Sequence, residues 1–297
     1  MNDGVVAALR KAGAISSEAR DIGYELIDKG VSYLEVAEEV EEVIRNSGGT
    51  PAFPVNIGVN EIAAHYTPSS TDDKKFGNGD VVKLDVGAHV DGYIGDTAIT
   101  VEVGTRNYHD LIESSRKALA IALEMIGEGV AVSTLGGAIE RSIKDDGFSP
   151  VINLTGHGMD RYSLHAGLTI PNIDDGNLSR VKSGMVIAIE PFATNGGGQV
   201  MNGKPGNIFR VLRERPLKDK KALEFFSEIR TKFNKLPFCE RWCTSMNPNA
   251  PSHLKTLLRH GLISSYPILY ECKKGIVTQA EHTVLIKNSK IEILTSP

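Results

Sequence analysis

The chain has 297 residues, of which 41% are hydrophobic, 24% charged and 6% aromatic. These proportions exclude a disordered, collagen-like or coiled-coil protein, and no apolar run reaches the roughly 18 residues that a membrane-spanning helix needs. The net charge is −4, but the segment from Arg210 to Lys274 holds 14 Lys and Arg against 6 Asp and Glu, which indicates either a solvated basic subdomain or a surface for an acidic partner.

Two helices followed by strands are predicted in the first third of the chain. Apolar residues at helical spacing from Val5 to Leu26 predict the first helix. The capping-box pattern of Ser32–Glu35 opens a second helix that ends near Asn46. Strand-like segments follow at 55–60, 81–90 and 93–103.

The same order of elements then repeats. A stripe from Leu111 to Met125 and a segment from about Ser133 to Asp146 predict two more helices. The strands expected after them lie at 151–158, 185–194 and 208–212. Beyond residue 216 we expect helices at 218–235 and 252–260, a short hairpin wing at 261–271, and strands at 278–287 and 290–295. The repetition predicts a pseudo-symmetric α+β domain that a basic, winged-helix-like insertion interrupts.

A predicted hairpin places two aspartates together. Asp91–Gly92 between two strand-like runs is a strong signal for a two-residue turn. A turn there sets Asp96 opposite Gly87, which shares a sheet face with Asp85 because side chains alternate along a strand. The two carboxylates are therefore diagonal neighbours, and their apolar surroundings favour a shared cation over two unpaired anions.

Three further polar residues lie in or beside apolar strands: His157 between two glycines, Glu190 before Pro191, and Glu281. Taken singly, each is better explained as a satisfied polar residue of the core. Together with the two aspartates they make four acids and one imidazole, and the sequence offers no evident basic residue to neutralise them. Two divalent cations would balance these charges, and the oxygen-rich donor set suits Mn, Fe, Co or Zn. Such a pair activates water and polarises a carbonyl, so the predicted chemistry is hydrolysis.

The order of these residues resembles that of a known family. Asp85 and Asp96 precede a histidine between glycines, a glutamate before Pro-Phe and a glutamate before His-Thr. This order is similar to that of the metal-dependent aminopeptidases with the pita-bread fold, a group that includes methionine aminopeptidases, prolidases and aminopeptidase P. The similarity covers nearly the whole chain and implies a pseudo-symmetric pita-bread fold.

Other positions are similar to the type II methionine aminopeptidases in their short archaeal form. The segment Asn60–Pro68 matches the type II signature around a histidine, here His65. His165 matches the second family histidine, eight residues after the predicted ligand His157.

The spacing of the last two acidic residues resembles type II rather than type I enzymes. Glu190 and Glu281 are 91 residues apart, which leaves room for the helical insertion of the type II group. The resemblance implies a catalytic domain formed by residues 1–194 and 271–297, and an insertion subdomain at 195–270.

By the same resemblance, five side chains hold two divalent metal ions. Asp85 is implied to chelate one ion, and His157 with Glu190 to hold the other. Asp96 and Glu281 are implied to bridge the two ions. Glu190 is also implied to shuttle a proton during catalysis.

The resemblance also implies residues that contact the substrate. His65 and His165 are implied to be catalytic, through hydrogen bonds to the substrate and its tetrahedral intermediate. The side chains implied to line a pocket for the N-terminal methionine are Phe53, Leu164, Phe192 and Tyr266.

The implied function is removal of the initiator methionine from nascent chains and peptides whose second residue is small. Two alternatives stay open: an Xaa-Pro aminopeptidase or prolidase on the same fold, and a non-catalytic pita-bread protein that binds RNA or the ribosome. Three cysteines cannot form a disulfide framework, so we expect a cytoplasmic protein. We expect a monomer without membrane contact, and leave association with the ribosome open.

Overall fold

A computed structural model of the chain describes residues 1–287 and 290–296. Its helices are α1 (Asp3–Leu26), α2 (Tyr33–Asn46), α3 (His109–Met125), α4 (Val132–Asp145), α5 (Lys220–Phe233), α6 (Glu240–Met246) and α7 (Ala250–Arg259). Its strands are β1 (Thr50–Pro51), β2 (Asn56–Val59), β3 (Ile62–Ala64), β4 (Val81–Val90), β5 (Tyr93–Glu102), β6 (Ser149–Pro150), β7 (Thr155–Met159), β8 (Thr169–Pro171), β9 (Val186–Ile189), β10 (Phe192–Thr194), β11 (Val200–Val211), β12 (Phe238–Cys239), β13 (Ile263–Glu271), β14 (Val277–Gln279), β15 (His282–Lys287) and β16 (Lys290–Ile293). Within the described residues, no helix is both long and apolar enough to cross a bilayer.

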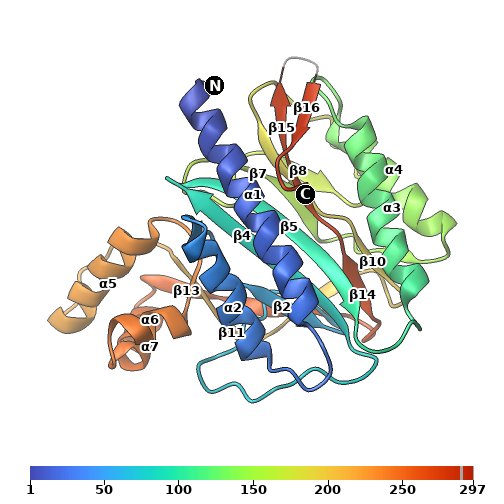
Figure 1. Ribbon diagram of the computed structural model, residues 1–297. Coiled ribbons are helices and arrows are strands. Elements are labelled where there is room, and N and C mark those ends of the chain that lie inside the picture. The colour runs from blue at the N-terminus through green and yellow to red at the C-terminus, as the bar shows by residue number, and fades with distance from the viewer. Residues whose placement is uncertain (288–289, 297) are drawn as a thin grey trace.

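The predicted repetition of a helix pair and strands is confirmed (Figure 1). In the first half, α1 and α2 pack on the sheet formed by β1, β2, β4 and β5. In the second half, α3 and α4 pack beside the sheets β16-β15-β9-β7-β8 and β14-β10-β6. Each half therefore has its own apolar core between helices and strands.

Polar side chains cap the first two helices: α1 begins at Asp3, two residues before the predicted apolar stripe, and α2 begins directly after the predicted cap Ser32. Asn2 Oδ1 accepts a hydrogen bond from Val5 N at 2.9 Å. Ser32 Oγ accepts one from Leu34 N at 3.2 Å. Each cap satisfies a backbone N–H that has no partner within its helix.

A seam of hydrogen bonds joins the two halves along β5 and the segment between β14 and β15. Glu281 N donates to Ala98 O at 3.0 Å, and Asp96 N donates to Thr283 Oγ1 at 2.8 Å. Thr97 Oγ1 donates to Glu281 O at 2.8 Å. The seam holds Asp96 and Glu281, which are far apart in the sequence, next to each other.

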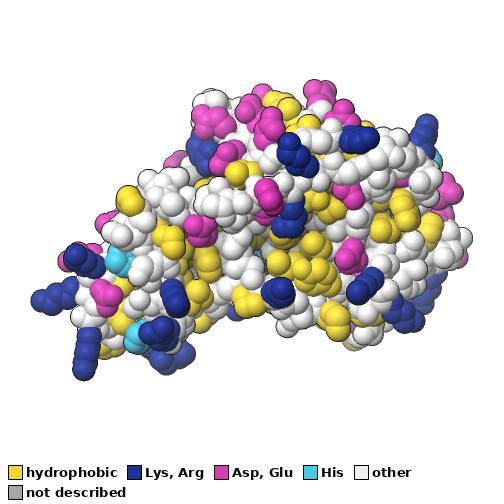
Figure 2. Space-filling model, turned by 90° about the horizontal axis from the view of Figure 1, so that it is seen from below, with side chains coloured by type: hydrophobic (Ala, Val, Ile, Leu, Met, Phe, Trp, Pro, Cys, Tyr) yellow, Lys and Arg dark blue, Asp and Glu magenta, His cyan; other side chains and the backbone are white. Residues whose placement is uncertain are grey.

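Helices α5, α6 and α7 form a lobe beside the antiparallel strands β11 and β13 (Figure 1). Lysine and arginine side chains gather on this lobe, at the left of Figure 2. The hairpin wing predicted at 261–271 is wrong, because this segment is one strand, β13, that pairs with β11 rather than with itself. On its other side β13 pairs with β3, so the lobe is tied to the first half.

Several predicted strands are shorter or interrupted: the strand expected at 278–287 is divided into β14 and β15, and the one expected at 290–295 ends at Ile293. The strand expected at 151–158 begins only at Thr155, and Asn172 Nδ2 instead binds the carbonyls of Val151 at 3.4 Å and Leu154 at 3.0 Å. The strand expected at 185–194 is divided into β9 and β10 around Pro191, because proline has no N–H to donate to a neighbouring strand.

Candidate functional site

The β4–β5 hairpin places Asp85 and Asp96 on one face, as predicted. Its turn residues Asp91 and Gly92 have φ angles of 52° and 86°, the left-handed values that a type I′ turn requires. The register pairs Gly87 with Asp96. The two carboxylates are therefore diagonal neighbours.

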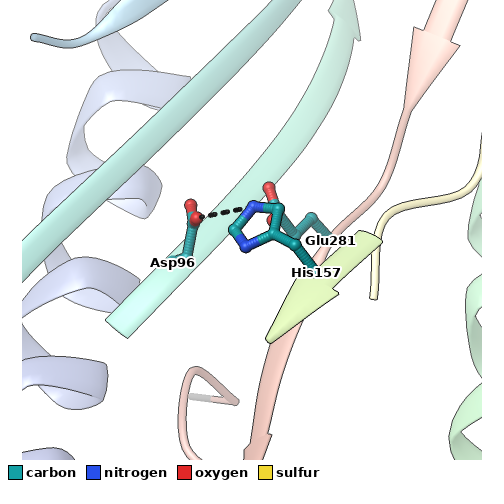
Figure 3. Close-up of side chains that lie close together, drawn as sticks. All are labelled: Asp96, His157 and Glu281. Atoms are coloured by element: carbon teal, nitrogen blue, oxygen red, sulfur yellow. Dashed lines mark ion pairs between the residues drawn. The ribbon is translucent and has the colours of Figure 1, made fainter. Parts of the chain in front are cut away.

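Neighbouring strands of the second half bring three more predicted ligands to this face. His157 lies in β7, Glu190 follows β9, and Glu281 comes directly before β15. Strands β7, β9 and β15 are adjacent in one sheet. Figure 3 shows Asp96, His157 and Glu281 pointing toward one another from separate strands.

The distances within this group leave room for a cation. One ligand atom from each of Asp96, His157 and Glu281 lies within 4.8 Å of the other two. His157 Nε2 is 3.7 Å from Asp96 Oδ2 and 3.6 Å from Glu190 Oε1. These separations exceed an ordinary hydrogen bond, so His157 Nε2 faces the two carboxylates at ion-pair distance without a direct hydrogen bond to either.

Burial and mutual repulsion make the carboxylates hard to ionise without a cation. Burial raises the pKa of Asp85 to about 7. The pKa values of Asp96, Glu190 and Glu281 lie well above their usual range, first because of burial and then because of the neighbouring carboxylates. Burial, with a smaller effect of His165, lowers the pKa of His157 to about 3, so its imidazole is neutral at pH 7.

This donor set fits divalent metal ions. Asp85 Oδ1 and Asp96 Oδ1 are buried and have no hydrogen-bond partner among the described residues. Buried anions without partners cost several kcal/mol, roughly, unless a cation compensates for them. Carboxylate oxygens with one neutral imidazole suit Mn, Fe, Co or Zn.

Two further histidines lie beside the cluster. The ring centroid of His165 is 4.3 Å from that of His157, and burial is the main reason that the pKa of His165 falls to about 4. Burial also lowers the pKa of His65. His65 Nδ1 lies 3.2 Å from Pro267 O, and a carbonyl can only accept, so Nδ1 carries the proton and Nε2 is left as an acceptor.

A cavity of about 230 Å³ adjoins these groups. Every side chain predicted for the site lines it: Phe53, His65, Asp85, Asp96, His157, Leu164, His165, Glu190, Phe192, Tyr266 and Glu281. The Phe53 ring rests against Gly87, where an added Cβ would lie 2.2 Å from the ring. The structure therefore combines a polar metal-binding wall with apolar walls in one small cavity.

Gln279 lies beside the cluster and was not predicted. It is 2% exposed, and its Nε2 donates to Glu190 Oε2 at 3.2 Å and to Glu281 Oε2 at 3.4 Å. The alternation of side chains along a strand puts residues two apart on one face, so its position two residues before Glu281 could have identified it.

A buried lysine lies close in sequence to these acids but does not neutralise them. Lys83 is 1% exposed in β4, two residues before Asp85. Its Nζ donates to Asn60 O and to Val277 O, both at 2.8 Å. Lys83 therefore ties the β2–β3 turn to β14 through backbone carbonyls, and no ion pair joins it to a carboxylate among the described residues.

A wider groove of about 930 Å³ lies between α2 and α6. None of the predicted site residues lines it. Its buried carboxylate, Glu41, is matched by Arg241, whose Nη2 lies 2.9 Å from Glu41 Oε1. Cavity size alone therefore does not identify the site.

Comparisons with known proteins agree with this geometry. A family profile described as Metallopeptidase family M24 matches residues 7–288. A methionine aminopeptidase from Methanocaldococcus jannaschii is 46% identical over 285 residues, which cover 96% of this chain and 96% of that protein.

Solved structures match the whole chain at lower identity. A methionine aminopeptidase from Thermotoga maritima covers 100% of this chain and 98% of its own, with a TM-score of 0.73 and 22% identity. A thermophilic Arx1 covers 100% of this chain and 92% of its own, with a TM-score of 0.88 and 17% identity. At these identities the likeness shows the fold alone, and it confirms the predicted pita-bread architecture.

Proposed function

The chain belongs to metallopeptidase family M24, and from that premise we propose that it is a methionine aminopeptidase acting on peptides and nascent proteins with a small second residue. The observation that carries the proposal is the cavity in which buried, unpaired carboxylates face neutral imidazoles and apolar walls. That combination suits the hydrolysis of a peptide whose first side chain is apolar.

We propose that two divalent metal ions bind there, chosen from Mn, Fe, Co and Zn. The ligands proposed are Asp85, Asp96, His157, Glu190 and Glu281. A bound ion of this kind acidifies a water molecule and polarises a carbonyl. Charge balance supports two ions, because four carboxylates crowd a buried space and the pKa values of Asp96, Glu190 and Glu281 are raised by burial and then by neighbouring carboxylates.

The remaining polar side chains are proposed to orient the peptide and move protons. The unprotonated His65 Nε2 can accept a hydrogen bond from a peptide N–H, since Nδ1 is held by Pro267 O. His165, also neutral, can donate to the scissile carbonyl as negative charge develops on its oxygen. Glu190 is proposed to carry a proton to the departing amine, and the Gln279 amide fixes its Oε2.

The apolar walls are proposed to receive the methionine side chain. Phe53, Leu164 and Phe192 are buried, and Tyr266 lies with its ring centroid 5.1 Å from that of His65. Aromatic and aliphatic walls suit a flexible, polarisable thioether.

Residues 195–270 are proposed to form the insertion subdomain, within a catalytic domain of residues 1–194 and 271–297. An apolar cluster supports this division, because its fully buried members all lie between Phe209 and Ile263. The cytoplasmic location and the monomeric state stay predictions from the sequence, and association with the ribosome stays open.

The test compares two peptides with the Mn-loaded protein. We expect Met-Ala-Ser to lose its methionine and Ala-Pro peptides to be cleaved far more slowly. Preferential cleavage of the proline peptide would instead identify an Xaa-Pro peptidase. Absence of cleavage together with salt-sensitive RNA binding would identify a non-catalytic binding protein.

Two histidine variants separate the proposed roles. His157→Ala should lose bound metal and turnover together, whereas His65→Ala should lose turnover and keep its metal. Metal content measured after gel filtration distinguishes the two. Equal metal loss in both variants would contradict the assignment.

A further inference from the structure

Asn56 is a buried polar residue of the cavity that the proposed reaction has not used. It is 6% exposed at the start of β2 and lines the cavity. It is the register partner of Asp85 across β2 and β4. Partners in an antiparallel pair stand on the same sheet face, with Cβ atoms about 5 Å apart, so the amide of Asn56 lies beside the Asp85 carboxylate.

The orientation of this amide is fixed by its backbone neighbour. Asn56 Nδ2 donates to Pro54 O at 2.8 Å. Exchanging the amide oxygen and nitrogen would set two acceptor oxygens against each other, so the observed orientation is the favourable one. Asn56 Oδ1 is then the free end of the side chain, and it has no hydrogen-bond partner among the described residues.

An acceptor buried in this way calls for a donor. Asp85 Oδ1, on the neighbouring strand, also lacks a partner, so two unpartnered oxygens stand side by side on one cavity wall. Leaving such oxygens unsatisfied is unfavourable. A ligand that satisfies these oxygens therefore brings a hydrogen-bond donor or positive charge to this wall.

The substrate of an aminopeptidase brings such a group. Its N-terminal residue carries a free amino group next to the carbonyl that is attacked. We propose that Asn56 Oδ1 accepts a hydrogen bond from this α-amino group, an inference that rests on the proposed function. A neutral amide suits the role, because it supplies an acceptor without adding another negative charge to the crowded carboxylates.

Asn153 offers a matched control in the same cavity. Its Nδ2 donates to Val200 O at 2.8 Å, and its Oδ1 accepts from Val200 N at 2.9 Å. Both ends of its amide are therefore engaged by the backbone. Asn153 therefore has no free acceptor for a ligand, although it is also an asparagine that lines this cavity.

The experiment compares two ligands that differ only in the amino group. Methioninol and 4-(methylthio)butan-1-ol are titrated calorimetrically into the Mn-loaded protein, and Mn affinity is measured separately. The wild type should prefer methioninol, and Asn56→Ala should reduce that preference about tenfold, as expected for loss of one hydrogen bond to a charged or strongly polar group. Asn153→Ala should keep the preference within about twofold.

Three results would overturn the proposal. Asn56→Ala could weaken both ligands equally, which would assign the side chain to packing. It could lower Mn affinity while keeping the preference for the amine, which would make Asn56 a metal ligand. Asn153→Ala could lose the preference as fully as Asn56→Ala, which would remove the contrast between the two amides. If one of these results is obtained and the wild type still cleaves Met-Ala-Ser, the proposed function stands and only the role of Asn56 fails.

Discussion

Two cavities of this protein contain buried carboxylates, and they stabilise them in opposite ways. In the groove between α2 and α6, Glu41 accepts from Arg241 Nη1 and Nη2 at 3.0 and 2.9 Å and from Trp242 Nε1 at 2.7 Å. In the smaller cavity, the Gln279 amide is the side-chain donor that reaches the carboxylates of Glu190 and Glu281. In the larger cavity the carboxylate is therefore paired with an arginine. In the smaller cavity the carboxylates of Asp85, Asp96, Glu190 and Glu281 have no lysine or arginine partner among the described residues, and we call them the unmatched cluster.

The difference separates a structural carboxylate from a functional one. A guanidinium with good geometry offsets the desolvation of Glu41, so the pair holds α6 against α2. The clustered acids instead have raised pKa values, which are typical of functional sites. Four predictions test this contrast, from the largest expected effect to the smallest.

The largest effect should follow loss of a ligand from the unmatched cluster. Asp96→Asn should lower kcat/KM for Met-Ala-Ser by more than the roughly 10- to 100-fold typical of residues outside the metal's own ligands. Asp91→Asn is the control, because Asp91 is exposed in the turn of the same hairpin and asparagine tolerates its left-handed backbone. An Asp96→Asn enzyme with full activity would refute a ligand role.

Glu41→Gln should instead act on stability. Removing one partner of a buried ion pair leaves Arg241 uncompensated and should lower the free energy of unfolding by about 3–5 kcal/mol. Urea denaturation measures this loss. Glu42→Gln, in an exposed pair with Arg45, should change stability by no more than about 0.5 kcal/mol. Equal effects of the two substitutions would remove the contrast between the cavities.

Metal addition should stabilise the protein through the unmatched cluster alone. At a free Mn²⁺ concentration of a hundred times Kd, the free energy of unfolding should rise by about 2.7 kcal/mol. Thermal unfolding across a Mn²⁺ titration gives the value. Glu41→Gln should respond like the wild type, whereas Asp96→Asn should respond much less. The same response in Asp96→Asn and wild type would place the ion elsewhere.

In the metal-free protein, the contribution of Asp85 to stability should fall as the pH rises from about 4 to about 7. Burial raises the pKa of Asp85 from 3.8 to about 7, so in this window the folded state binds a proton that the unfolded state releases. One such carboxyl changes the free energy of unfolding by about 1.4 kcal/mol per pH unit. Urea titrations with a chelator measure the slope in the wild type and in Asp85→Asn, and the difference between the two slopes is the contribution of Asp85. A wild-type slope no more negative than that of Asp85→Asn would contradict the sign.

The sequence determined the local parts of the site. Side-chain alternation and the Asp91–Gly92 turn suffice to bring Asp85 and Asp96 together, and the register agrees with that prediction. Helix periodicity and caps located the helix pairs, because they act within a few residues. The short helix α6 and the single strand β13 escaped prediction, since both contact segments far away in the sequence.

Only the tertiary structure decided which polar atoms have partners. The sequence shows a lysine near Asp85, but not that Lys83 Nζ reaches carbonyls at Asn60 and Val277. It shows two asparagines, but not that Asn153 is engaged by Val200 while Asn56 keeps a free oxygen. Residue order and periodicity are local properties, and they determine which side chains lie on each face of a strand. Whether a buried atom is satisfied depends on segments that meet only after folding, and that is the physical reason the sequence alone left it open.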